Sequence, residues 1–296
     1  MKLATLGVSV AALTLLAMVS PAAGESRIEK DLALVPGGRV SVDSEVGSVT
    51  ITGTERHGAH IVVTSDQDDL NSALEITYTS GAGWASVTAR RKDQSIWSHR
   101  LSVHFEIEVP TETRTSVRTG GGSITLAGLR GDAAAKTSGG PIEVDGLDGS
   151  LEAHTSGGPI RLREVTGNAH ISTSGGPITV QSLDGNLLAH TSGGGIRIDR
   201  VSGFVNASTS GGGVRVAYSP GDRLGGEIET SGGGIEVTLD PTVNLNLDAS
   251  TSGGSVHSDL HVSGDVSRSH IHGSIGSGGE ELRLHTSGGS IHIRAL

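Results

Sequence analysis

The chain has 296 residues, a formal net charge of −10 and no cysteine. The lack of cysteine excludes a disulfide framework, a thiolate metal site and a cysteine nucleophile. The negative charge argues against nucleic acid and anionic lipid as partners, because both attract a positive face. Glycine is abundant at 46 residues, and it recurs periodically, which separates the chain from disordered low-complexity sequences.

The first predicted element is a secretory signal peptide over residues 1–24. A lysine at position 2 is followed by an apolar run from Leu3 to Val19 and by small residues from Pro21 to Gly24. This order is typical of a cleaved signal, since the run is at the short limit for crossing a bilayer. We expect an exported protein, periplasmic, cell-envelope or extracellular, with no integral membrane span in its mature form. An uncleaved anchor is the alternative.

Residues 25–113 are predicted to form an N-terminal cap region of irregular β-strands. Alternating apolar and polar residues predict strands over 39–43, 48–52, 59–64, 74–79, 84–89 and 101–109. Gly81-Ala82-Gly83 suits a hairpin turn, because glycine reaches positive φ at little cost. Four of the six aromatic residues fall here, namely Tyr78, Trp84, Trp97 and Phe105. We expect some of them to cover the open end of a solenoid, whereas a separate binding module would expose an aromatic patch.

Residues 114–296 are organised around a repeated hexapeptide, Thr-Ser-Gly-Gly-Pro-Ile and its variants. Copies 18 residues apart begin at Thr137, Thr155, Thr173, Thr191 and Thr209, an eroded copy begins at Thr119, and later copies begin at Thr230, Thr251 and Thr286. A period near 20 residues with glycine pairs and alternating aliphatics is typical of a solenoid. The long interval from Val256 to Leu284 is expected to be an enlarged coil or a degenerate rung containing Ser277-Gly278-Gly279.

Side-chain parity within a coil separates inward from outward positions. The first inward ladder contains Ile142, Ile160, Ile178, Ile196, Val214, Ile235, Val256 and Ile291. The second contains Val144, Leu162, Val180, Ile198, Val216, Val237 and Ile293, with Ser258 as an interruption. The third contains Leu147, Val165, Leu183 and Val201, and a turn stack contains Gly149, Gly167, Gly185 and Gly203. The repeated Thr also falls on the inward side.

The aliphatic spacing favours a coil of two main strands and two turns over a left-handed hexapeptide helix. Ile142, Leu147 and Leu151 are five and four residues apart, whereas a hexapeptide helix needs a spacing of six. Proline lacks an N–H, so each sheet strand should begin at the Ile that follows it. The sequence therefore predicts an all-β protein: a parallel β-solenoid, or β-helix, with an irregular N-terminal β cap. Its handedness stays open.

The repeated T-S-G-G-x-I-x-V units, the alternating N-terminal strands and the Val109-Pro110 junction resemble the bacterial putative-adhesin family, an exported β-strand-repeat domain of unknown function. The resemblance covers roughly Val40 to Leu296. It implies a parallel β-solenoid and a cell-envelope or secreted location. It supplies no catalytic motif that could be carried over to this chain.

Cofactor and metal chemistry find little support in the repeats. No Lys-Ser/Thr and no helix follows the glycine pairs, so they do not match phosphate loops. The Asp of calcium-binding β-rolls is missing from every Ser-Gly-Gly unit. Six histidines fall late in the chain: His257, His261, His270, His272, His285 and His292. Imidazoles at such spacing bind zinc or copper in other proteins, but the outward column before Thr also accepts Lys, Ser and Glu, which indicates a solvated face. We expect no cofactor and no metal site.

The leading functional hypothesis is a non-enzymatic structural or interaction protein, adhesin-like in character. The alternative is a polysaccharide-active β-helix enzyme, a lyase or hydrolase, which would need convergent carboxylates. The outward column mixes charges instead, so Glu143 with Arg161 and Arg215 with Glu236 are expected to pair across rungs. We therefore assign no catalytic residue. The expected partner is an envelope protein or a polysaccharide and not nucleic acid, and a monomer or an end-to-end oligomer both stay open.

Overall fold

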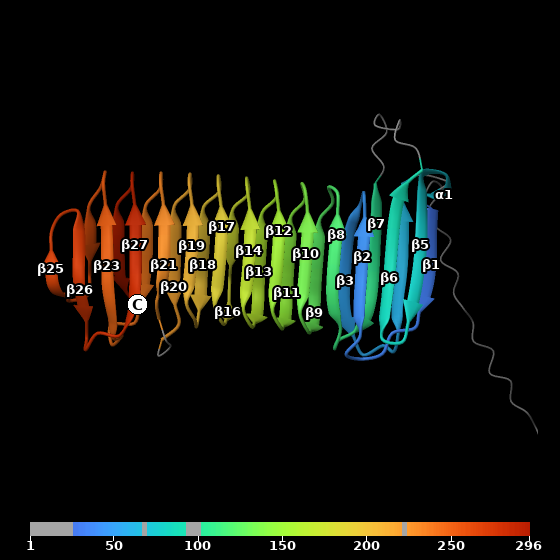
Figure 1. Ribbon diagram of the computed structural model, residues 1–296, viewed down its shortest axis with the longest axis horizontal. Helices are drawn as coiled ribbons and strands as arrows, with labels where there is room; N and C mark the ends of the chain where they lie inside the picture. Colours follow the sequence, from blue (N-terminus) through green and yellow to red (C-terminus); the bar gives the residue numbers. More distant parts are fainter. Residues whose placement is uncertain (1–25, 67–69, 93–101, 221–223) are drawn as a thin grey trace, which may run out of the picture.

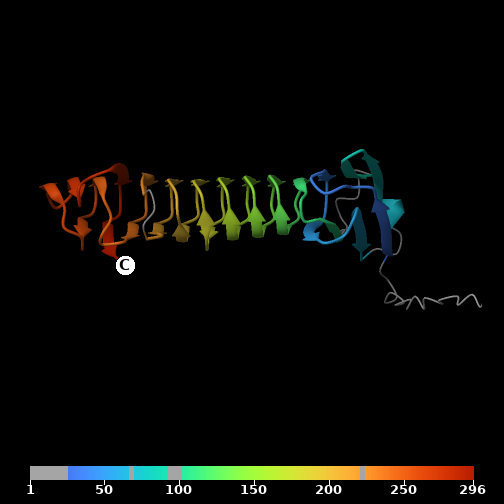
Figure 2. The same cartoon turned by 90° about the horizontal axis from the view of Figure 1, so that it is seen from below.

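The computed structural model describes residues 26–66, 70–92, 102–220 and 224–296. The predicted signal peptide and Trp97 lie outside these ranges. The described chain forms a rod of stacked β-strands, with the cap region at one end and the strands of residues 263–275 at the other (Figure 1). Two sheets of 14 strands each run along the rod, and Figure 2 shows them as two facing layers. The prediction of an all-β parallel solenoid is confirmed.

The first sheet, called sheet A here, is parallel through most of its length. Its strands in spatial order are β1 (Ser26–Leu32), β4 (Ala59–Ser65), β7 (Val103–Pro110), β3 (Ser48–Thr54), β9 (Ile124–Arg130), β11 (Ile142–Asp148), β13 (Ile160–Thr166), β15 (Ile178–Val180), β18 (Ile196–Val201), β20 (Val214–Tyr218), β22 (Ile235–Leu239), β28 (Ile291–Ala295) and β24 (Val256–Ser258), with β16 (Leu183–Asp184) between β13 and β18.

The second sheet, called sheet B, faces sheet A across the core. Its strands in spatial order are β5 (Leu74–Gly81), β6 (Trp84–Arg91), β2 (Arg39–Ser44), β8 (Arg114–Thr119), β10 (Ala133–Thr137), β12 (Leu151–Thr155), β14 (Ala169–Thr173), β17 (Leu187–Thr191), β19 (Val205–Thr209), β21 (Gly226–Thr230), β27 (Glu280–Thr286), β23 (Leu245–Thr251), β26 (His270–Ile275) and β25 (Ser263–Val266).

Each regular coil places one strand in each sheet, and the predicted side-chain parity is confirmed. In the coil formed by β11 and β12, Ile142, Val144, Leu151, Ala153 and Thr155 are buried. The residues between them face outward, because successive side chains of a strand point to opposite faces. The buried aliphatic residues of all coils form one continuous core along the rod. Burial of this core is the main favourable term for folding.

The predicted ladders form by in-register parallel pairing. Ile142 lies beside Ile160 and Leu147 beside Val165, and Gly167 lies against Gly149 at the turn. The strands begin at the Ile after Pro, as expected: the carbonyl of Pro159 accepts a hydrogen bond from the Ile142 N–H at 3.0 Å. Proline therefore keeps its acceptor in the ladder while its missing N–H falls in the turn.

The cap region is built around an inserted coil. β2 and β3 form the first coil in sequence, yet they lie between two later coils. In sheet B, β2 lies between β6 and β8, and in sheet A, β3 lies between β7 and β9. Antiparallel strands β1 and β5 then close the two sheet edges. Both sheets continue unbroken into β8 and β9, so the predicted division at residues 113 and 114 marks the start of the sequence repeat and not a gap in the sheets.

The C-terminal end is built in the same way, which corrects the expected ladder order. β27 lies between β21 and β23, and β28 lies between β22 and β24. The first ladder therefore runs from Ile235 to Ile291 and then to Val256. Stacking in sequence order would instead place Val256 between Ile235 and Ile291. The C-terminus accordingly lies beside the end of β22, where the Leu296 N–H donates to the Leu239 carbonyl at 2.9 Å, and not at the tip of the rod (Figure 1).

The interval from Val256 to Leu284 differs from both expected forms. It contains β25 and β26, which extend sheet B in antiparallel pairing beyond β23, and then the start of β27. Ser277-Gly278-Gly279 is the connection between β26 and β27. Because β26 and β25 occupy the end of sheet B, the chain returns inward for its last coil.

The sequence-based expectations for the cap region hold for most of its strands. All six predicted strands are present, and β5 and β6 form the expected hairpin, with Gly81 opposite Trp84. Strand β1 and the short helix α1 (Leu70–Ala73) were missed. Phe105 is buried in the core, and Tyr78 is partly buried and packs against the core. Trp84, in contrast, is 45% exposed. In the described part of the chain, no helix has the length and apolarity to cross a membrane.

Candidate functional site

The repeated Thr-Ser-Gly-Gly edge of the rod is used by the fold itself. The Thr155 hydroxyl donates to the Gly140 carbonyl of the preceding coil at 2.9 Å and accepts from the Gly158 N–H at 3.3 Å. Equivalent bonds recur at Thr173 and Thr191. Each buried hydroxyl therefore ties one coil to the next and satisfies a turn N–H, as buried polar groups require. The hexapeptide is a structural joint.

Charged residues on the outer face of sheet A pair across neighbouring coils, as expected. Arg161 lies 3.1 Å from Glu143, and Arg215 lies 3.1 Å from Glu236. Arg163 lies 3.7 Å from Asp145 in the same pair of coils. These carboxylates are engaged with guanidinium groups on adjacent strands, so they do not converge on a common point as a glycosidase pair would.

Several outward histidines pair with serine on the next strand of the sheet. His154 Nδ1 lies 2.7 Å from Ser172 Oγ, and His190 Nδ1 lies 2.8 Å from Ser208 Oγ. His285 makes the same pair with Ser250 at 3.1 Å. These are in-register neighbours, so the repeat geometry alone brings a hydroxyl to each imidazole.

The late histidines are only partly brought together. His257 and His292 are in-register neighbours, with ring centroids 6.3 Å apart, and His257 Nε2 lies 3.2 Å from Asp259. His270 and His272 share the outer face of β26, as predicted for one strand. Within the described residues, no group of three or more His, Asp or Glu side chains is placed to hold a metal ion.

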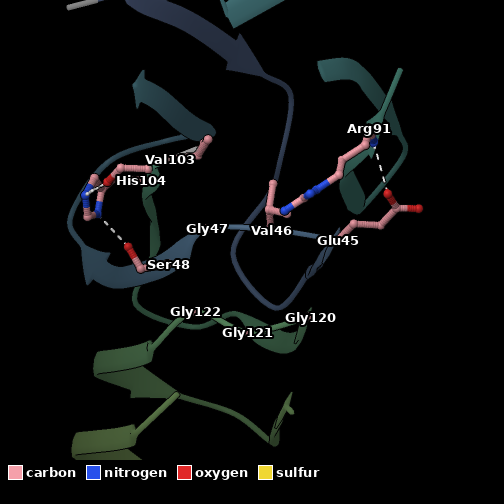
Figure 3. A pocket seen from close by; sticks show the side chains of 11 residues that line it. Glu45, Val46, Gly47, Ser48, Arg91, Val103, His104, Gly120, Gly121 and Gly122 are labelled. Carbon is pink, nitrogen blue, oxygen red and sulfur yellow. Dashed lines mark hydrogen bonds between the residues drawn. The ribbon is translucent and has the colours of Figure 1, made fainter. Parts of the chain in front are cut away.

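A hollow of about 830 Å³ opens where the cap region joins the regular coils. It is lined by the turn from Glu45 to Ser48, by Arg91, by Ser102 to His104 and by Gly120 to Gly122. Figure 3 shows Ser48 and His104 pointing toward one another, with Glu45 and Arg91 on the other side and the three glycines between these groups and the next coil. This hollow is the first candidate site.

The side chains of the hollow make hydrogen bonds of the kind found along the rod. Ser48 Oγ lies 2.5 Å from His104 Nδ1, and Ser102 Oγ lies 3.4 Å from His104 Nε2. A Ser–His pair resembles a nucleophile with its base, but the same pair occurs on plain sheet B coils. Glu45 accepts a hydrogen bond from the Arg91 backbone N–H at 3.0 Å. We therefore assign the pair to the cross-strand series.

The second candidate site is a basic face on sheet B, which the sequence analysis missed. Arg39 lies in register with Arg114, and Arg118 lies in register with Lys136. All four side chains are exposed. The neighbouring carboxylate of Asp43 is bound by Arg90 at 2.7 Å, and this hydrogen bond lowers the pKa of Asp43. Arg39 and Arg114 are far apart in sequence and become neighbours only because β2 is inserted beside β8.

Solved structures that match this chain at low sequence identity come from several bacteria. A putative adhesin of Bacteroides fragilis NCTC 9343 is 11% identical, covers 92% of this chain and 97% of its own, and has a TM-score of 0.42. A putative lipid binding protein of Parabacteroides distasonis ATCC 8503 is 13% identical, with coverage of 92% and 97% and a TM-score of 0.46. A putative adhesin of Parabacteroides merdae ATCC 43184 is 10% identical, with coverage of 92% and 96% and a TM-score of 0.34.

No curated protein matches the chain in sequence. The sequence profile of the Toastrack DUF4097 family, in contrast, matches residues 18–294. This match spans the cap region, the regular coils and the inserted C-terminal coil. The expected resemblance to an adhesin family of unknown function is thereby confirmed, and the chain belongs to the Toastrack DUF4097 family.

Proposed function

We propose that this protein is a non-enzymatic, exported rod that acts by binding, an adhesin-like component of the cell envelope or its surroundings. The observation that carries the proposal is the contrast between the two sides of each coil. Inward columns repeat small aliphatic residues and threonine from coil to coil, whereas the outward column of sheet B changes from Lys136 to His154 to Ser172. A uniform interior supports the rod, and a varied exterior supplies contacts.

The polar groups that could serve catalysis are used in the framework. Threonine hydroxyls join the coils, serine and histidine bond across strands, and carboxylates on sheet A pair with arginine. A general acid or base needs a free partner within hydrogen-bond reach of a substrate. This use of the polar residues supports a binding role over the alternative of a polysaccharide-active enzyme.

The proposed export rests on the signal sequence predicted over residues 1–24. An envelope protein or an envelope polysaccharide would then be the partner. The test is a pull-down from envelope fractions with the purified chain and with a variant lacking residues 174–209, which removes two whole coils and joins Thr173 to Ser210. The cap-proximal end is unchanged in this variant, so we expect both proteins to retain the same partner.

Two results would count against this function. If neither protein retains any envelope component over a reference rod-like protein, the binding role is wrong. If incubation with envelope polysaccharides releases new reducing or unsaturated ends, the protein is an enzyme and the alternative holds. Equal retention by both proteins, without product release, is the outcome the proposal predicts.

A further inference from the structure

The outer face of sheet B carries an unusual arrangement of cations near the cap region. On β2 and β8, Arg39 and Arg114 are direct neighbours, and on β8 and β10, Arg118 and Lys136 are direct neighbours. Like charges directly opposite each other on adjacent strands are destabilising. These four residues therefore place repulsion into a protein whose overall charge is negative.

Several cations elsewhere on the rod are paired with carboxylates, such as Arg56 with Glu108 and Arg161 with Glu143. Arg197 and Arg215 are also in-register neighbours, on sheet A. There, Arg197 Nε lies 2.7 Å from Asp199, and Arg215 lies 3.1 Å from Glu236. Over the described ranges, none of the four sheet B cations makes an ion pair within 4.0 Å. Asp43 lies in register with Arg118, but its carboxylate is bound by Arg90 at 2.7 Å and attracts Arg118 only from a longer distance. An anion from outside the chain would supply the missing partner.

Small side chains form a trough between the two cation pairs. Ser86, Ser41, Ser116 and Ala134 are consecutive in-register neighbours on β6, β2, β8 and β10. Arg39 and Arg114 stand two positions to one side of this row, and Arg118 and Lys136 stand two positions to the other. Two hollows of about 410 and 270 Å³ adjoin Ala134 from its two sides. The trough runs along the rod, across the strands.

The form of the trough suits a linear polymer with regularly spaced negative groups. Cations on each wall recur at the strand spacing of about 4.8 Å, and arginine binds planar carboxylates in a bidentate manner. The serine hydroxyls of the floor can donate to or accept from sugar hydroxyls. Trp84 lies in register with Arg39 and is 45% exposed, so its ring offers an apolar surface at the outer end of the trough.

We propose that this trough binds a linear polysaccharide that carries carboxylate groups, such as a chain of uronic acids. The proposal rests on the binding function proposed above and names the ligand class. Single-stranded nucleic acid fits less well, because its binding grooves present several stacking aromatic side chains, and Trp84 is the only exposed aromatic side chain among the residues that the structure describes. Glu152, which lies in register with Ala134, lines both hollows, and Asp132 lines the larger one.

The test measures binding of polygalacturonate to the purified chain by calorimetry at low salt. Two variants alter one wall each, Arg39→Gln with Arg114→Gln and Arg118→Gln with Lys136→Gln. We expect each to weaken binding at least about tenfold, since hydrogen bonds to charged groups are the strong ones and 1.4 kcal/mol corresponds to a factor of ten. Binding should also weaken with added salt, because exposed charges are screened.

The matched control replaces two in-register cations that already have carboxylate partners, Arg197→Gln with Arg215→Gln. This control changes the net charge equally and should leave polygalacturonate binding within twofold of the wild type. Without ligand, Arg118→Gln with Lys136→Gln should melt at the same temperature as the wild type or higher, because like-charge repulsion is removed. A loss of binding in a protein of unchanged melting temperature is then not a folding defect.

Several outcomes would overturn the inference. An equal loss of polygalacturonate binding in the sheet A control would show a general effect of net charge. If neutral dextran binds as tightly as polygalacturonate, the protein does not recognise the carboxylates. Tighter binding of single-stranded DNA would assign the trough to nucleic acid, and salt-sensitive dimers broken by the sheet B variants would assign it to a second copy. If envelope partners are still retained by both wall variants, the proposed function stands and this ligand assignment fails.

Discussion

The middle of the rod and its C-terminal end use the same hexapeptide joint but stack it in different orders. From β10 to β19, every coil rests on the coil that precedes it in sequence, with partners 18 residues apart. At the end, β27 is inserted between β21 and β23, so Thr286 bonds to the carbonyl of Gly233, 53 residues away. The middle is held by local contacts, whereas the end joins segments that are distant in the chain. This comparison predicts that the two regions respond differently to equivalent changes.

Removal of residues 280–296 should have the largest effect. These residues bury Leu282, Leu284, Ile291 and Ile293, and their loss separates β23 and β24 from the rest of the rod. At about 1.5–3 kcal/mol for each of these four buried aliphatic side chains, the unfolding free energy should fall by about 6–12 kcal/mol. Removal of the two central coils over 174–209 should cost far less, because the flanking coils carry the same joint and can stack directly.

Hydrogen exchange followed by mass spectrometry checks this first prediction. The truncated protein should lose protection in β23 and β24 while β10 to β19 stay protected, and the internal deletion should keep protection at both flanks. Unchanged protection in β23 after truncation would contradict the inserted coil.

The stacked glycines of the middle coils offer the next largest effect. A Cβ on Gly158 would overlap the carbonyl oxygen of Gly140 in the preceding coil. We expect Gly158→Ala to destabilise the rod by at least about 2 kcal/mol, because backbone atoms cannot move aside cheaply. Gly157→Ala, in the same turn, places its Cβ 3.6 Å from the nearest atom, the Gly139 carbonyl oxygen, and should be tolerated. Urea melts of both variants give the measurement, and equal midpoints would refute the stacking.

The threonine ladder should contribute a smaller amount per coil. Thr155→Val keeps the shape of the side chain but leaves the Gly140 carbonyl and the Gly158 N–H without their hydroxyl partner. We expect a loss of about 1–3 kcal/mol. Ser156→Ala is the control, because Ser156 is exposed and adjacent in sequence. A Thr155→Val variant as stable as wild type would show that these two hydrogen bonds do not stabilise the stacking of the coils.

Much of the fold was predictable from the sequence, because the spacing of neighbouring residues decides which stacked column of the coil each residue occupies. The Ile and Val ladders, the turn glycines and the inward Thr follow from parity and from the period. The order of the last coils does not, since Thr251 and Thr286 begin the same motif, and the motif alone does not say which strand lies beside β21. Antiparallel pairing of β26 with β23 occupies the outer edge of β23, and no short-range pattern encodes this pairing.

The basic face on sheet B was harder to predict from the sequence, because part of it depends on which coils lie side by side. Lys136 and Arg118 are one coil apart, and the mixed residues of their column are typical of a solvated face. Arg39 lies in the cap region, and its place beside Arg114 depends on the insertion of β2 between β6 and β8. The expected carboxylate–arginine pairs on sheet A, in contrast, follow from the regular period and are confirmed.

Tyr218 marks the transition between the two regions and should give the smallest effect. It lies in register with Val201 at the end of the third ladder, and its hydroxyl donates to the Gly225 carbonyl at 3.1 Å. Tyr218→Phe should cost about 1 kcal/mol at neutral pH. Tyr78→Phe is the control, because the buried Tyr78 hydroxyl has no hydrogen-bond partner among the described residues, and it should cost nothing.

The pH dependence of the same residue sharpens the comparison. Burial raises the pKa of the Tyr218 hydroxyl, whereas an unfolded tyrosine loses its proton near pH 10. The native state therefore retains a proton that the unfolded state releases, and stability that is fully present below about pH 10 is lost as the pH rises above it. Between pH 8 and pH 11, the melting temperature should fall less steeply for Tyr218→Phe than for the wild type. Parallel curves would show that Tyr218 titrates equally in both states.

The order of the C-terminal coils can be tested directly, because the chain contains no cysteine of its own. Glu229 lies in register with His285, and Ser250 lies one strand further on. Adjacent strands are about 4.8 Å apart, within the Cα range of a disulfide, whereas two strand spacings exceed it. The measurement is disulfide formation under mild oxidation in two variants, Glu229→Cys with His285→Cys and Glu229→Cys with Ser250→Cys. The inserted coil predicts a rapid disulfide in the first and none in the second, and the reverse result would show that the coils stack in sequence order to the end.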